Sequence, residues 1–219
     1  MIVRFLFCIC LLLPTEAFTA NLDGNNAGMT PLLAAANAGE LGNVKALVGA
    51  GADLSEKNPQ GATALIIAAG RGNVEMVAFL LDQKADIYAK TKQGTQALTI
   101  ATQEGKSSVV KLLLDRGADP DNRNNLGQTA LMIASFFGKA DCATPLLQKG
   151  AKVDLKDDNG EFALSIAAAK GHLDVVKLLV EGGANPAQKN SKGSTPLLIA
   201  TDKNKTAVVE YLLSRKTKQ

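Results

Sequence analysis

The chain has 219 residues, a hydrophobic fraction of 46%, an aromatic fraction of only 4% and a formal net charge of +3. The apolar content is sufficient for a buried core, and the shortage of aromatic residues requires this core to consist of closely packed Ala, Leu, Val and Ile. Lys and Arg are distributed along the whole sequence, whereas nucleic-acid-binding proteins concentrate them on one face. We therefore expect no nucleic-acid partner.

The first 20 residues have the features of a secretory signal peptide. Arg4 precedes an apolar run of nine residues over 5–13, which Pro14 ends. Small side chains in the following segment favour cleavage after Ala17, with Ala20 as the second choice. The run is less than half of the about 20 apolar residues that a membrane-spanning helix needs. The leader therefore predicts export without a stable membrane anchor.

The cysteines indicate how the exported chain is stabilised. Cys8 and Cys10 belong to the leader, so the mature chain keeps Cys142 alone and can form no internal disulfide. Stability must then come from packing. An exported chain without disulfides favours the bacterial periplasm as its location, with secretion as the alternative.

A glycine recurs every 33 residues after a polar lead-in over residues 21–27, and a leucine follows each of these glycines four residues later. The six positions are Gly28, Gly61, Gly94, Gly127, Gly160 and Gly193. We refer to them as the anchor glycines. A fixed period of this size predicts a stack of repeats instead of a single globular core. We expect six repeats over residues 28–216 and a short tail over 217–219.

The local signals within one period predict two short helices and a turn. In the first repeat, Thr30 can cap a helix that begins at Pro31, and Gly39 can end it in a left-handed conformation. A second apolar stripe, which includes Val44 and Leu47, follows at helical spacing. Residues 160–186 are the copy that follows this pattern most closely.

The pattern of T-P-L, two alanines, a glycine, paired valines, paired leucines and a closing G-A resembles the ankyrin repeat. The resemblance covers about 190 residues in six successive copies. It implies an all-α solenoid in which each repeat contributes two antiparallel helices and joins the next through a short hairpin or turn. No single repeat can bury its apolar stripe, so neighbouring repeats must cover it.

Several repeats depart from the pattern. Lys84 replaces the closing glycine of the second repeat, and Asn204 replaces the glycine between the helices of the sixth, which ends the array as a terminal cap. The fourth repeat departs most, because Cys142 and Ala143 replace the valine pair. Pro145 also falls inside its second helix, where we expect it to bend or loosen that helix. We interpret Cys142 as a small buried hydrophobic residue.

The residue types needed for catalysis are scarce. The only histidine, His172, stands where the ankyrin pattern often has one, and the mature chain has a single cysteine. Neither a tetrahedral zinc site nor a His-assisted nucleophile can be assembled from them in the usual way. Asp157, Asp158 and Glu161 form an acidic turn whose spacing does not match a calcium-binding loop. We expect no enzyme activity, cofactor, metal or small-molecule substrate.

The ankyrin resemblance implies a concave face made of the turn tips and the exposed side of each first helix. The register places on it the two residues before each anchor glycine, the residue after it, and those nine and ten residues beyond it. In the fourth repeat, Phe136, Phe137 and Leu126 occupy such positions and predict an apolar hot spot. The alternative is that one or both rings turn inward, toward the space left by Cys142 and Ala143. The predicted partner contacts are Phe136, Phe137, Leu126, Gln128, Arg71, Glu104, Gln103, Glu161 and Lys170.

These observations predict an exported protein–protein interaction module that is monomeric before it binds another extracytoplasmic protein on its concave face. A specific form of this function is a stoichiometric inhibitor or protector against a periplasmic or cell-wall-directed enzyme. The alternative is a structural scaffold that tethers several envelope proteins. The partner's identity does not follow from the sequence, because ankyrin surfaces are general supports whose specificity depends on local side chains.

Overall fold

The structure is a computed structural model that describes residues 28–216, and within these residues it contains twelve helices and no strand. The predicted leader, lead-in and tail lie outside this range. The helices are α2 (Pro31–Ala38), α3 (Leu41–Gly49), α4 (Ala64–Arg71), α5 (Val74–Asp82), α6 (Ala97–Gln103), α7 (Ser107–Asp115), α8 (Ala130–Phe137), α9 (Ala140–Gln148), α10 (Ala163–Lys170), α11 (Leu173–Glu181), α12 (Pro196–Asp202) and α13 (Thr206–Lys216).

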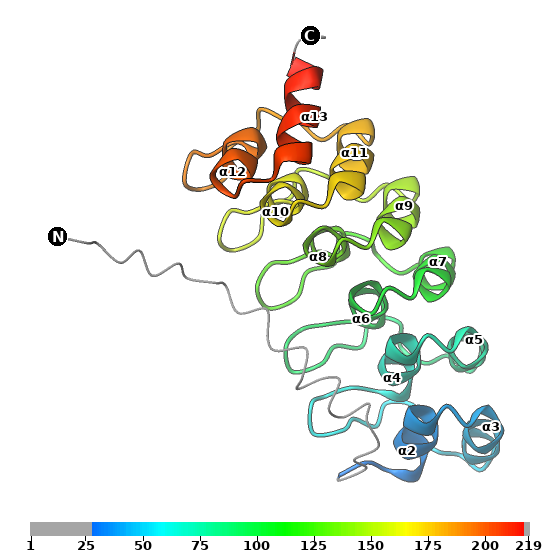
Figure 1. Ribbon diagram of the computed structural model, residues 1–219. Helices are drawn as coiled ribbons and strands as arrows, with labels where there is room; N and C mark the ends of the chain where they lie inside the picture. Colours follow the sequence, from blue (N-terminus) through cyan, green and yellow to red (C-terminus); the bar gives the residue numbers. More distant parts are fainter. Residues whose placement is uncertain (1–27, 217–219) are drawn as a thin grey trace.

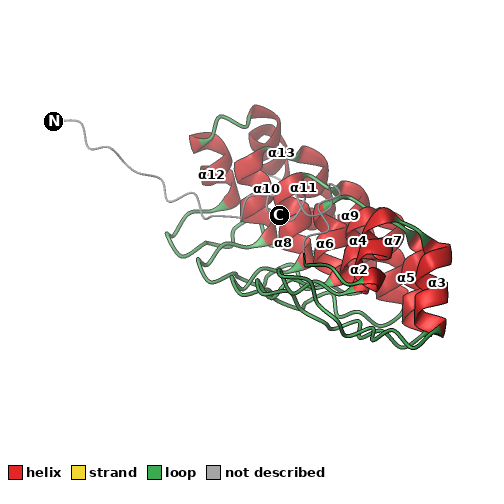
Figure 2. Cartoon of the chain, turned by 90° about the horizontal axis from the view of Figure 1, so that it is seen from below, coloured by secondary structure: helices red, strands yellow, loops and turns green. Residues whose placement is uncertain are grey.

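The helices form two parallel rows (Figure 1). We call the even-numbered helices the inner row and the odd-numbered helices the outer row. Each inner helix packs against its outer partner and against the next inner helix, and the loops between repeats project together to one side of the inner row (Figure 2). The described chain is therefore an all-α solenoid of six helix pairs, as the sequence predicts.

Stacking is what makes these helices stable. They contain only 7 to 11 residues, whereas isolated helices shorter than about 12–15 residues are marginal in water. One continuous core runs through the stack from Leu32 to Leu212, and most of its members are Ala, Leu, Val and Ile. Each repeat thus depends on its neighbours to cover its apolar side.

Most inner helices begin at a threonine cap. The side-chain oxygens of Thr30, Thr63, Thr129 and Thr195 each accept a hydrogen bond from the backbone N–H three residues further on. The fifth repeat differs from the pattern, because Phe162 occupies this position in α10 with its ring fully buried. Its backbone N–H instead donates to the hydroxyl of Ser165 at 2.9 Å.

The loops between repeats share one turn. Its central residue stands three places before the anchor glycine, and its side-chain oxygen accepts the backbone N–H of the residue four places further on. These central residues are Asn58, Thr91, Asn124, Asp157 and Asn190. Such local side-chain acceptors favour turns over helix or strand. The connections are therefore tight turns that need no strand pairing.

Hydrogen bonds join each loop to the next. The backbone N–H of Asn125 donates to the carbonyl of Gln93 at 3.1 Å, and that of Asp158 donates to the carbonyl of Leu126 at 3.2 Å. The ammonium group of Lys90 donates to the carbonyl of Arg123, 33 residues away. Part of the basic content thus serves to connect the loops.

Four of the six anchor glycines, Gly61, Gly94, Gly127 and Gly160, are required by this close approach of neighbouring loops. Gly127 has a φ of +71°, and a Cβ atom there would lie 2.9 Å from the backbone nitrogen of Asp158. Gly61 has the same relation to the backbone nitrogen of Lys92. Only glycine combines this conformation with the absence of a side chain. At these four positions the 33-residue register therefore corresponds to one repeated contact between loops.

The fourth repeat keeps a regular second helix despite its unusual sequence. Contrary to the expected loosening, α9 continues past Pro145 to Gln148, and Lys149 N–H bonds to the Pro145 carbonyl at 3.0 Å. Cys142 and Ala143 are fully buried, which confirms the interpretation of Cys142 as a core residue. The packing of α9 against α7 and α11 holds the helix on both sides. Within residues 28–216, no helix is long and apolar enough to cross a membrane.

Candidate partner-binding face

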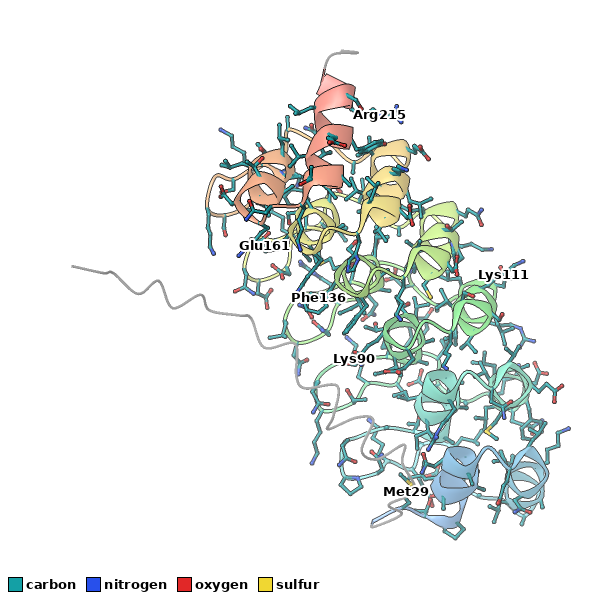
Figure 3. All side chains as sticks on the ribbon, viewed as in Figure 1. Met29, Lys90, Lys111, Phe136, Glu161 and Arg215 are labelled. Atoms are coloured by element: carbon teal, nitrogen blue, oxygen red, sulfur yellow. The ribbon has the colours of Figure 1, made fainter. Side chains whose placement is uncertain are left out.

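The nine predicted contact residues fall into two groups at opposite ends of the inner helices. The helix-end group lies at or just beyond the C-terminal ends of α4, α6, α8 and α10, which pack side by side. It contains Arg71, Gln103, Glu104, Phe136, Phe137 and Lys170. The loop group lies before α8 and α10 and contains Leu126, Gln128 and Glu161 (Figure 3 labels Phe136 and Glu161). Because α8 has eight residues and is about 12 Å long, Leu126 and the phenylalanines do not form one compact patch.

Phe136 and Phe137 form an aromatic pair at the end of α8. Their ring centroids are 5.0 Å apart at an interplanar angle of 71°, which is the edge-to-face arrangement that aromatic pairs prefer. Both residues are half-buried. In the described chain, neither is among the half-buried side chains that pack against the core. The two rings therefore stand outside the continuous core, and their contact with a partner stays a prediction.

Residues of the fifth repeat contact the aromatic pair. The ammonium nitrogen of Lys170 lies 3.8 Å from the centroid of the Phe136 ring, within the range of a cation–π interaction. Nε2 of His172 lies 3.1 Å from the backbone carbonyl oxygen of Phe136. Since a carbonyl can only accept, Nε2 carries the proton and donates. His172 therefore joins the end of α8 to the start of α11, as its predicted structural role requires.

The other predicted charged residues have polar partners within the chain. Arg71 donates to the Asn37 side chain at 2.8 Å, and Glu104 accepts from Gln103 at 3.2 Å. Glu161 accepts from the hydroxyl of Ser165 at 2.7 Å and from the side-chain amide of Asn190 at 2.8 Å. These bonds hold the three charged groups in place before any partner arrives.

The loop group is less exposed than the register predicted. Leu126 is 36% exposed at the tip of its loop, but Gln128 is only 6% exposed. The Gln128 side chain accepts from the Asn124 amide at 3.1 Å, and its backbone N–H donates to the Asn124 side chain. The expected exposure of Gln128 is therefore wrong, because the residue after the anchor glycine is enclosed by its own turn.

Comparison with protein families agrees with the six helix pairs. A family profile described as ankyrin repeats in three copies matches residues 34–124, 85–157 and 131–219, which together cover most of the chain. The chain is an ankyrin-repeat protein. Among curated proteins, no significant match was found. Ankyrin repeats are protein–protein interaction modules, typically without enzyme activity.

Two titratable residues of this ankyrin-repeat protein, Cys142 and Asp157, have pKa values that burial changes. Burial raises the pKa of the Cys142 thiol to about 11, so the reactive thiolate is scarce near neutral pH. Burial also raises the pKa of Asp157, although backbone N–H groups of Glu161 and Asn159 bond to its carboxylate. In residues 28–216, no group of three or more His, Cys, Asp or Glu side chains could hold a metal ion.

Sequence reasoning missed the residues that support this face of the ankyrin stack. Ser165 and Asn190 fix the Glu161 carboxylate, and Asn37 fixes Arg71 across 34 residues. One signal was available: Ser165 accompanies the loss of the threonine cap at Phe162. The pairing of Asn190 with Glu161 joins neighbouring repeats and has no local sequence signature.

Proposed function

We propose that this ankyrin-repeat protein is an exported binding module, monomeric until bound, that holds one extracytoplasmic protein on its inner row and loops. In this proposal it acts as a stoichiometric inhibitor or protector against a periplasmic or cell-wall-directed enzyme. The observation that carries the proposal is the half-buried edge-to-face pair Phe136 and Phe137 at the end of α8, which is not part of the continuous core. Aromatic residues of this kind are enriched among binding hot spots.

Two further observations support a binding role. Arg71, Glu104 and Glu161 are held by hydrogen bonds within the chain, so their ordering does not have to be supplied when the partner binds. The leader predicted over residues 1–20, which lies outside the described residues, supports an extracytoplasmic partner.

The proposal is tested by purifying the tagged protein from the cell envelope and measuring the mass of the complex. We expect a single partner at one-to-one stoichiometry, and the activity of that partner should fall when the purified ankyrin-repeat protein is added. Several partners with unchanged activities would contradict this proposal and favour the scaffold. Recovery only from cytosol, with the first 17 residues still attached, would contradict export.

A further inference from the structure

Lys170 differs from the other charged residues among the nine predicted contacts. Arg71, Glu104 and Glu161 each have at least one hydrogen-bonding partner inside the chain. Lys170 is exposed, and within residues 28–216 its ammonium group has no hydrogen-bond acceptor and no carboxylate within ion-pair distance. Within these residues, the ammonium group contacts the Phe136 ring.

The Phe136 ring positions the ammonium group of Lys170 but accepts no conventional hydrogen bond from its N–H donors. A lysine ammonium has three N–H donors, and a cation–π contact of about 3.8 Å restricts its position by attraction to the ring face. The result is a positive donor fixed beside the edge-to-face pair Phe136 and Phe137. The helix-end group therefore presents an apolar surface next to an ammonium group whose N–H donors have no acceptor within residues 28–216.

Resting on the proposed function, we infer that the partner places an acidic side chain on Lys170 and an apolar side chain beside it against Phe136 and Phe137. An acidic group would complete the hydrogen bonding of Lys170. A basic group would meet a like charge, and no carboxylate of residues 28–216 lies within ion-pair distance of Lys170 to offset the repulsion, which disfavours such partners. Glu104 and Glu161 do not reverse this preference because of where they lie. Glu161 precedes α10, whereas Lys170 ends it, and Glu104 follows α6, on the other side of α8 from α10.

A random peptide library displayed on phage tests the inference without knowledge of the natural partner. We expect peptides selected on the exported protein to be enriched in Asp or Glu next to an apolar residue. On Lys170→Arg the same enrichment should persist, since Arg keeps the charge and the ring contact. On Lys170→Glu the enrichment should change to Lys and Arg.

Synthetic versions of the selected peptides give the quantitative test by fluorescence anisotropy. Lys170→Met keeps an apolar stem over the ring but removes the charge, and it should weaken binding of acidic peptides by about tenfold at low salt, as loss of a close interfacial charge pair does. Lys111→Met removes an equal charge from α7 in the outer row, on the other side of the molecule from Phe136 (Figure 3), and should leave binding unchanged. Added salt should reduce the difference.

The two proposals fail in different ways in this experiment. Peptides that require Phe136 and Phe137 but are not enriched in acidic residues, and that bind Lys170→Met as tightly as the unchanged protein, would overturn the acidic preference alone. Peptides that bind Phe136→Ala with Phe137→Ala as tightly as the unchanged protein would overturn the aromatic site of the proposed function.

Discussion

Two residues within the described range 28–216 adopt a left-handed backbone without being glycine. Lys84 has a φ of +69° and Asn204 a φ of +55°, each at a helix end where other repeats have glycine. Asn tolerates this conformation better than Lys, because its short polar side chain can bond locally. Lys84 is therefore the more strained of the two.

Lys84→Gly should increase the free energy of unfolding by about 1 kcal/mol, because it relieves this strain at an exposed position. Denaturant titration measures the change. Gln83→Gly is the matched control: Gln83 has an ordinary φ of −80°, so glycine there should be neutral or destabilising. Equal effects of both substitutions would show that the conformation at Lys84 carries no strain.

Asp157 is the one acidic residue among the five central turn residues, and three of the other four are Asn. Asn offers the same acceptor oxygen without a buried charge, so Asp157→Asn should stabilise the protein by up to about 1 kcal/mol at neutral pH. The reciprocal control, Asn124→Asp, should destabilise it.

The pH dependence follows from the direction of the shift. The folded-state pKa of Asp157 is raised above its ordinary value of 3.8, so the folded state binds the proton more tightly than the unfolded state. Stability therefore rises as pH falls through the raised pKa and levels off below the ordinary value. The advantage of Asp157→Asn should shrink as pH approaches about 4, measured by denaturant titration at each pH. An advantage that does not change over this range would contradict burial of the charge.

Among the helices, α8 is the one whose C-terminal end carries aromatic residues on the inner row. Its end is held by the His172 contact to the Phe136 carbonyl and by Lys170 over the Phe136 ring. The backbone contact does not depend on the phenylalanine side chains. The rings can therefore be removed without removing the connection between the repeats.

Phe136→Ala with Phe137→Ala should weaken partner binding by more than about 2 kcal/mol and shift the thermal unfolding midpoint little. Calorimetric titration and a thermal melt on the same samples measure both. Val74→Ala is the control, since Val74 is an exposed hydrophobic residue on α5 in the outer row, 38% exposed. A large loss of stability with unchanged affinity would assign the rings to folding.

At the scale of the whole molecule, the protein is a one-dimensional array in which each repeat contacts only its neighbours. Its free energy of unfolding is then approximately the sum of the intrinsic stability of each repeat and the energy of each interface between neighbouring repeats. At Gly61, Gly94, Gly127 and Gly160 the backbone of the next loop lies closest. Within residues 28–216 no further loop stacks on Gly193, where a Cβ would have nothing within 4 Å.

A comparison of Gly127→Ala with Gly193→Ala measures how much the contact between neighbouring loops contributes to stability. Both positions have a positive φ, +71° and +77°, so backbone strain of about 1 kcal/mol applies to each. Only at Gly127 would the added methyl group meet the backbone of Asp158, so its cost should exceed that of Gly193→Ala by about 1 kcal/mol or more. Equilibrium denaturation compares the two. Equal losses of unfolding free energy would show that the neighbouring loop moves to accommodate the methyl group at no cost in stability.

The sequence by itself determined the fold and the register of this protein. The period depends on local rules: a helix cap such as Thr30, a left-handed glycine such as Gly39, and an apolar stripe that a neighbouring copy must cover. Because every repeat obeys the same rules, position in the period specifies the helix and the end of it on which a side chain lies. Phe136 and Phe137 could be located in this way.

Tertiary structure decided which of these side chains remain available to contact a partner. Distances between atoms, some of them in different repeats, determine that Gln128 is enclosed by its turn and that two groups bond to Glu161. They also determine that Lys170 has no polar partner in the part of the chain that the structure describes. Position in the period cannot predict them, because a hydrogen bond depends on the side chains that stand at one position in adjacent copies. The choice of Lys170 as the charged contact therefore required the folded chain.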